Sequence, residues 1–218
     1  MIKKLAAIMT VAIAPSLIGC NCEDCSCDEV HQVEQKLAKC QKKVGNFKLG
    51  KSTHYVHSDG FELDLKVTQD TTFKENNGDY CSEFITEIRN IELTSTYPVL
   101  SVNVQFSGGY TFTDDKTKQS VNPLLISYNG TSYSINLDDS GIPMSFDTKK
   151  PIKMLDTITF NGVTYDSVFV ILDNRYDNNN LPKNEKAVNL YFSRTKGILK
   201  LETIDKKSFT IKEGDTNE

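Results

Sequence analysis

The sequence predicts a mainly β protein, an antiparallel sandwich or partly open barrel with one short N-terminal helix. Apolar and polar residues alternate in many short segments after residue 50, and two Asn-Gly pairs separate such segments. One earlier segment instead spaces its apolar residues by three and four, as a helix does. A chain of 218 residues, 38% of them hydrophobic, is long enough for one domain with a buried core.

The N-terminal residues have the layout of an export signal. Two lysines, Lys3 and Lys4, precede an apolar stretch over residues 5–18, which is followed by Gly19 and Cys20. The stretch is shorter than the roughly 20 residues that a membrane-spanning helix requires. We therefore expect this segment to direct export rather than to span a membrane.

The end of this segment, Leu17-Ile18-Gly19-Cys20, resembles the lipobox of bacterial lipoproteins. The resemblance implies that the signal peptide, residues 1–19, is removed and that Cys20 receives acyl chains as the new first residue. Several chains, at about 0.8 kcal/mol for each buried CH₂, hold a protein permanently to a membrane. Asn21 stands where lipoproteins retained in the inner membrane commonly have Asp, so if the cell is Gram-negative the resemblance implies the outer membrane. The alternative is an ordinary cleaved signal with an incidental cysteine.

A cysteine-rich tether over residues 20–29 follows the signal. The chain has six cysteines: Cys20, Cys22, Cys25, Cys27, Cys40 and Cys81. An oxidising compartment favours disulfides, but lipidation of Cys20 leaves five thiols, so one stays free or pairs with another chain. Alternatives are metal ligation by Cys22, Cys25 and Cys27, with Cys40 as a further ligand, and further modification of the tether. We expect no metal and no cofactor, because the spacing lacks the two paired elements of a structural zinc site.

Residues 30–49 are predicted to hold the short helix and a connection. Ser26 and Glu29 have the spacing of a capping box at its start, and Gly45 ends it. Its apolar stripe consists of Val30, Val33, Leu37, Cys40 and Val44. We expect the stripe to pack on the sheet of the same chain; the alternative is a stalk that dimerises through Cys40.

Residues 50–218 are predicted to form a single antiparallel β domain. The alternation is clearest at Phe61, Leu63, Leu65 and Val67, at Leu100, Val102, Val104 and Phe106, and at Val188, Leu190 and Phe192. Shorter strands are predicted around Ile91, Tyr110 and Phe209. Hairpins are predicted at Asn129-Gly130 and Asn161-Gly162, because these residues accept the positive φ of tight turns.

Few residues suggest chemistry. His54 and His57 are near Asp59, but a spacing of three on a strand places the two imidazoles on opposite faces, so we expect solvent-exposed strand residues rather than a zinc site. The segment Asp173–Asn180 is rich in oxygen ligands, yet Arg175 stands where a calcium loop needs Asp or Asn. No nucleophile motif and no glycine-rich phosphate loop is present, so we expect a protein that is not an enzyme.

The charge and a second resemblance complete the functional hypothesis. A formal charge of -4 argues against binding to nucleic acid. The segments Asn161-Gly162-Val163-Thr164-Tyr165, Tyr191-Phe192-Ser193 and Gly197–Glu202 resemble the closing strands of uncharacterised β-rich lipoproteins of Gram-negative bacteria. The layout is also similar to periplasmic lipoprotein carriers, which implies an apolar cavity closed by a helix.

We therefore expect a non-enzymatic lipoprotein anchored through a lipid on Cys20, which binds or presents an apolar ligand or an envelope protein at the outer membrane. The alternative is an envelope hydrolase whose catalytic residues are dispersed along the chain.

Overall fold

The computed structural model describes residues 31–78, 82–96, 99–114, 117–128, 131–144, 152–171, 187–203 and 205–213. Within them, the elements are β1 (His31–Gln35), η2 (Val44–Asn46), β2 (Ser52–His57), β3 (Glu62–Gly78), β4 (Ser82–Thr96), β5 (Val99–Ser107), β6 (Tyr110–Asp114), β7 (Thr117–Tyr128), β8 (Thr131–Leu137), β9 (Ile152–Phe160), β10 (Val163–Ile171), β11 (Ala187–Ser193), β12 (Gly197–Thr203) and β13 (Ser208–Ile211). The predicted mainly β, antiparallel character is confirmed. No helix in this part of the chain has the length and apolar character needed to cross a membrane.

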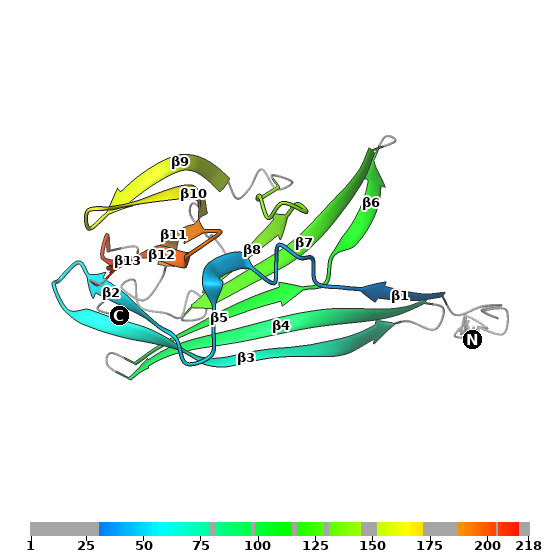
Figure 1. The fold of residues 1–218 in the computed structure, drawn as a ribbon, viewed down its shortest axis with the longest axis horizontal. Coiled ribbons are helices and arrows are strands. Elements are labelled where there is room, and N and C mark those ends of the chain that lie inside the picture. The colour runs from blue at the N-terminus through cyan, green and yellow to red at the C-terminus, as the bar shows by residue number, and fades with distance from the viewer. Residues whose placement is uncertain are drawn as a thin grey trace, which may run out of the picture.

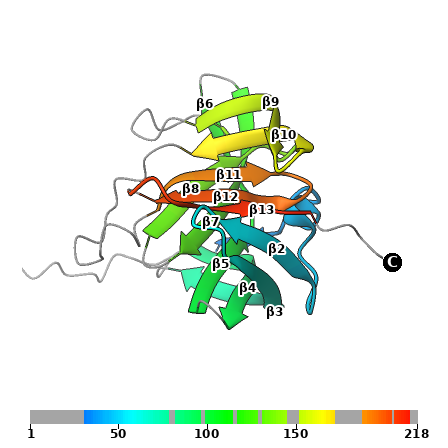
Figure 2. The ribbon, with the colours of Figure 1, turned by 90° about the vertical axis from the view of Figure 1, so that its left-hand side faces the viewer.

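The strands form one hydrogen-bonded sheet. Its main path runs β6-β7-β5-β4-β3-β2-β13-β12-β11-β10-β9, while β1 pairs with β4 and β8 pairs with β7. The β1–β4 pair is parallel, and the neighbours along the main path are antiparallel. The sheet curls so that β9 to β13 lie over β3 to β5 (Figure 1; end view in Figure 2). Among the described residues no ladder joins its two ends, so the sheet is open.

The core lies on the inner face of the curled sheet. The alternating residues that the sequence predicted for β3 and β5 are buried there: Leu63, Leu65, Val67, Leu100, Val102, Val104 and Phe106. Aromatic side chains from other strands, among them Tyr133, Phe169 and Phe192, fill the space between the layers. This packing gives no support to the apolar cavity that the carrier resemblance implied.

Both predicted hairpins are confirmed. Tyr128 pairs with Thr131 on either side of the first Asn-Gly pair, which itself lies outside the described residues. In the second hairpin, Asn161 has φ 48° and Gly162 has φ 82°. Positive φ at both central residues matches the right-handed twist of the strands, which is why Asn-Gly pairs favour two-residue hairpins.

The predicted N-terminal helix is wrong. His31–Gln35 is strand β1, and the next residues form turns and the three-residue 3₁₀-helix η2. Of the predicted stripe, Leu37 and Val44 are buried, but Val33 is 44% exposed. Backbone pairing of β1 with β4 replaces the internal hydrogen bonds of a helix. A local spacing pattern cannot detect this pairing because the partner lies about fifty residues away.

Residues 36–51, here called the strap, cross the curled sheet between β1 and β2 (Figure 1). Arg89 of β4 donates to the carbonyls of Lys42 and Phe47, and its guanidinium pairs with Asp70 of β3, with Nε 2.8 Å from Oδ1. On the other side, the Gly45 amide donates to the carbonyl of Arg194 at 2.8 Å. The strap is therefore fixed to both halves of the sheet.

The sheet divides where β5 leaves β4. Ser107 still pairs with Ile88, but after Gly108 and Gly109 the chain continues as β6 along β7 alone. A side chain on Gly108 would overlap the carbonyl of Gln35, so glycine lets β1 approach here and continue the sheet beside β4. One prong of this fork is β6 with β7. The other, here called the arm, is β1 with residues 69–78 of β3 and 82–88 of β4 (Figure 1).

Candidate functional site

The structure separates the two histidines that the sequence placed near each other. His54 and His57 lie three residues apart on β2, with His57 facing the core side and His54 on the other face. The strand spacing correctly predicted the opposite faces, but the predicted solvent exposure is wrong for His57, whose side chain is buried among the residues packed against β2. In the described residues no group of three His, Cys, Asp or Glu side chains is placed to hold a metal ion.

The outer histidine lies in a surface network of charges. His54 Nδ1 is 2.7 Å from Asp64 Oδ1, and its Nε2 is 3.1 Å from Glu62 Oε2. Lys212 Nζ pairs with Glu62 at 2.6 Å. The hydrogen bonds from Lys212 and His54 lower the pKa of the Glu62 carboxyl. The network joins β2, β3 and the segment after β13, and its exposed position suits surface pairing rather than acid–base catalysis.

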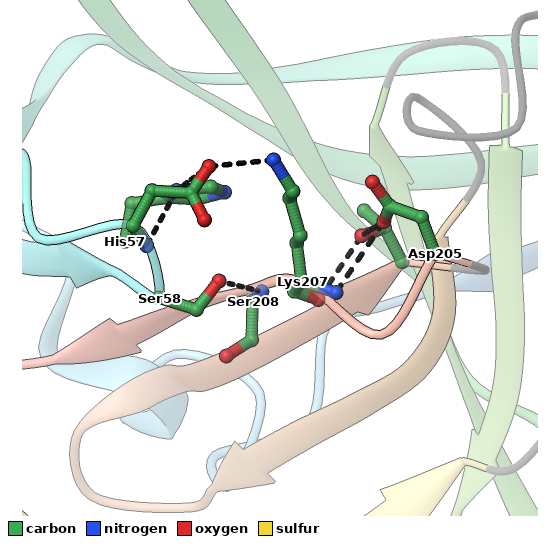
Figure 3. A network of polar contacts seen from close by, with 7 residues as sticks. His57, Ser58, Asp205, Lys207 and Ser208 are labelled. Carbon is green, nitrogen blue, oxygen red and sulfur yellow. Dashed lines mark hydrogen bonds and ion pairs between the residues drawn. The ribbon is translucent and has the colours of Figure 1, made fainter.

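The inner histidine is held between two turns, shown in Figure 3. The His57 ring stacks on Phe61, with centroids 4.2 Å apart, and its Nδ1 accepts a hydrogen bond from the Asp59 amide. The Asp59 carboxylate pairs with Lys207 at 2.5 Å. Burial lowers the pKa of the His57 imidazole, with the Asp59 carboxylate acting in the opposite direction. The His57 imidazole is neutral, and its Nδ1 accepts the hydrogen bond from the Asp59 amide. In this form it connects the β2–β3 turn to the β12–β13 turn.

The second turn is fixed by its own polar contacts. Thr203 Oγ1 donates to Asp205 Oδ1, and the same hydrogen bond is the main cause of the lowered pKa of Asp205. The Ser208 amide donates to Ser58 Oγ at 3.2 Å, across to the β2–β3 turn (Figure 3). These bonds occupy the polar groups around His57. The arrangement connects and stabilises two adjacent turns.

A cleft of about 300 Å³ lies between the strap, strand β10 and the β11–β12 turn. Its walls are Cys40, Lys43, Val44, Asp166, Ser167, Arg194 and Thr195. Lys43 and Arg194 bring two positive charges to it, and Asp166 brings one negative charge. The residues come from the strap, from β10 and from the β11–β12 turn, so the cleft exists only when the strap is in place.

The backbone is strained at one wall of the cleft. Ser167 has φ 49°, a left-handed conformation that costs a residue with a Cβ on the order of 1 kcal/mol. On either side of it, Asp166 pairs with Thr157 and Val168 with Leu155. Strained backbone of this kind is concentrated at binding and catalytic sites. The observation makes the cleft the best candidate site in the described part of the chain.

The Cys40 thiol in this cleft is a poor nucleophile. Burial raises its pKa, and the nearby carboxylates of Asp139 and Asp138 raise it further. Its Sγ lies 3.7 Å from the carbonyl oxygen of Asp138, which accepts the weak thiol hydrogen bond. A raised pKa lowers the fraction of thiolate, which is the form that attacks substrates and ligates metals. The charged groups of the cleft, Lys43, Asp166 and Arg194, can contact a small polar ligand without reaction at this thiol.

Sequence reasoning placed Cys40 among the possible disulfide partners; in the structure its thiol is free. Cys20, Cys22, Cys25, Cys27, Cys81 and the segment Asp173–Asn180 lie outside the described residues. The other cleft residues were missed, because Lys43, Asp166 and Arg194 are far apart in the sequence and form no motif.

Comparison with known proteins finds no matching family, no matching curated protein and no matching solved structure.

Proposed function

We propose that the protein is a lipoprotein of the bacterial cell envelope, exported by residues 1–19 and held by acyl chains on Cys20. The observation that carries the proposal is the run Leu17-Ile18-Gly19-Cys20 at the end of a basic and apolar leader. The fold is compatible with it, because β1 begins only eleven residues after Cys20 and lies in the arm, at one end of the molecule (Figure 1). Asn21 favours the outer membrane.

The first test compares Cys20→Ala with Cys22→Ala in the full chain, expressed with its leader. We expect the native protein and Cys22→Ala to fractionate with membranes and to show the mass of a chain that begins at Cys20 with added acyl groups. The Cys20→Ala variant should lose both the added mass and the membrane association. An unlipidated native chain that remains in the soluble fraction would contradict the proposal.

The protein acts by binding rather than by catalysis, and its ligand site is the cleft beneath the strap. Lys43 and Arg194 favour a ligand with an anionic group, and the Asp166 carboxylate can accept hydrogen bonds from the same ligand. The separation of His54 from His57 favours this view over a hydrolase, which needs an acid and a base in one cleft.

The cleft can be tested with inorganic phosphate as the probe. Phosphate that binds the native state should raise its melting temperature in proportion to the logarithm of the phosphate concentration. We expect this rise to disappear in the double variant Lys43→Gln and Arg194→Gln. The double variant Lys118→Gln and Lys153→Gln, with the same change of charge at exposed sites, should keep it. Equal responses from both variants would remove the cleft from the proposal.

A further inference from the structure

The arm has two faces of different chemistry. In a sheet, side chains of directly paired residues lie on the same face, and alternate residues along a strand share that face. Val33 pairs with Phe84, and Phe73 pairs with Ile88. Phe84 and Ile88 are four residues apart on β4, so their side chains lie on the same face of the sheet. These four apolar residues therefore lie on one face, here called the outer face of the arm.

The opposite face of the arm carries most of its charge. Lys74 of β3 pairs with Glu34 of β1 at 2.6 Å, and Asn76 donates to Glu83. Asp70 and Arg89 form their ion pair on the same side, which also faces the strap. On the outer face, Thr86 donates to Gln35 at 2.9 Å. The charged side chain that residues 69–78 of β3 place on this face is Glu75. The arm is thus an amphipathic three-stranded sheet.

The outer face exposes large apolar side chains to solvent. Phe73 is 48% exposed, Val33 44% and Phe84 38%, whereas Ile88 is buried. Val33 and Phe84 are direct neighbours across the β1–β4 pair. Apolar side chains that are grouped on one exposed face mark an interaction surface rather than the scattered exposure of ordinary surfaces.

The position of the anchor identifies what covers this face. Cys20 precedes His31, the first residue of β1, by eleven residues. A fully extended chain of that length reaches at most about 40 Å, so acyl chains on Cys20 keep the arm beside the bilayer at a high effective concentration. The chain enters the fold at the arm itself and not at the far end of the sheet (Figure 1).

From these observations we propose that the outer face of the arm rests on the lipid surface that holds Cys20, with Phe73 and Phe84 inserted among the headgroups. This inference depends on the lipid anchor of the proposed function. Aromatic and aliphatic side chains on one face of an amphipathic element enter the interface in this way, while the charged face remains in water. The cleft and the rest of the curled sheet then project away from the membrane.

The chain contains no tryptophan, so one substitution supplies a unique fluorescent probe. The lipidated full chain carrying Phe84→Trp or Phe73→Trp is reconstituted into vesicles of phosphatidylethanolamine and phosphatidylglycerol, with and without brominated phosphatidylcholine. We expect the brominated lipid to remove most of the emission of both variants. The matched control is Phe61→Trp, because Phe61 is 40% exposed and lies at the opposite end of β3. The brominated lipid should leave the tryptophan emission of this variant unchanged.

The outcomes separate the two proposals. If no variant, including the control, floats with the vesicles or carries added acyl mass, the lipid anchor itself is wrong. If all variants float but the brominated lipid quenches Phe84→Trp and Phe73→Trp no more than Phe61→Trp, the anchor stands and the membrane contact of the arm is wrong. Protection of the arm variants from aqueous iodide without quenching by brominated lipid would also overturn it, since a protein surface would then cover the face.

Discussion

His57 shows how one residue can make stability depend on pH. Its ring is packed between Phe61 and Phe209, and its Nδ1 accepts the Asp59 amide, so the neutral form fits the fold. Lys207, which pairs with Asp59, adds a positive charge that also opposes protonation. The pKa of His57 is consequently lowered in the folded state, mainly by burial.

We predict that the melting temperature falls as the pH drops from 7.5 to 5.5. The unfolded chain binds a proton near pH 6.5, the usual pKa of histidine, while the folded chain binds it only at lower pH. The contribution of His57 to stability is thus fully present above this window and is lost as the pH falls through it. His57→Phe keeps the ring packing but cannot titrate, so its melting temperature should fall less in thermal scans. An equal slope in both proteins would assign the pH dependence to other groups.

At the scale of elements, Gln41 joins the strap to the fork. Its side chain is fully buried, and its amide nitrogen donates to the carbonyls of Ser107 and Pro123, at 2.8 and 3.1 Å. The β5–β7 ladder ends at the pair of Phe106 with Leu124, next to Ser107 and Pro123. Pro123 has no N–H with which to continue the ladder. Gln41 therefore bonds to two carbonyl groups at the point where the β5–β7 ladder ends.

We predict that Gln41→Leu lowers the free energy of unfolding by about 2–4 kcal/mol, because it removes a buried side chain's hydrogen bonds to partly buried carbonyl groups. In a domain of this size, each kcal/mol lowers the melting temperature by about 2–4 °C. The control is Gln69→Leu on the exposed part of β3, whose cost should stay within about 0.5 kcal/mol. Urea unfolding measures both. A loss for Gln41→Leu no larger than the control would mean that these carbonyls are satisfied by water.

The elements also show what local sequence can and cannot predict. Alternation and Asn-Gly turns correctly predict β3, β5 and two hairpins, because these depend on neighbouring residues and on burial of one face. The helix prediction fails because this segment is fixed by contacts with distant residues. These contacts are the pairing of β1 with β4 and the hydrogen bonds that Arg89 donates to the strap. The cleft is unpredictable for the same reason, since the strap, β10 and the β11–β12 turn each supply part of it.

On the scale of the whole molecule, stability is distributed unevenly between the core and the arm. Strands β5, β8, β10 and β12 bury their side chains in one apolar cluster. In the arm, residues 71–78 of β3 are all exposed, and few buried apolar contacts support its hydrogen bonds. Segments with little buried apolar surface open at a lower free energy than the global unfolding of the protein.

We predict that amides of residues 69–78 exchange with deuterium by local opening, while those of β5 exchange only by global unfolding. In detergent, hydrogen-exchange mass spectrometry should show exchange in the arm that is nearly independent of low urea concentrations, and exchange in β5 that rises with them. Opening of the arm exposes little surface, which is why urea has little effect on it. The stability of the core is then independent of whether the arm contacts the lipid surface. The arm can therefore change conformation at that surface without destabilising the residues that line the cleft. If both regions responded equally to urea, the arm and the core would form one cooperative unit, and contact at the arm would be coupled directly to the cleft.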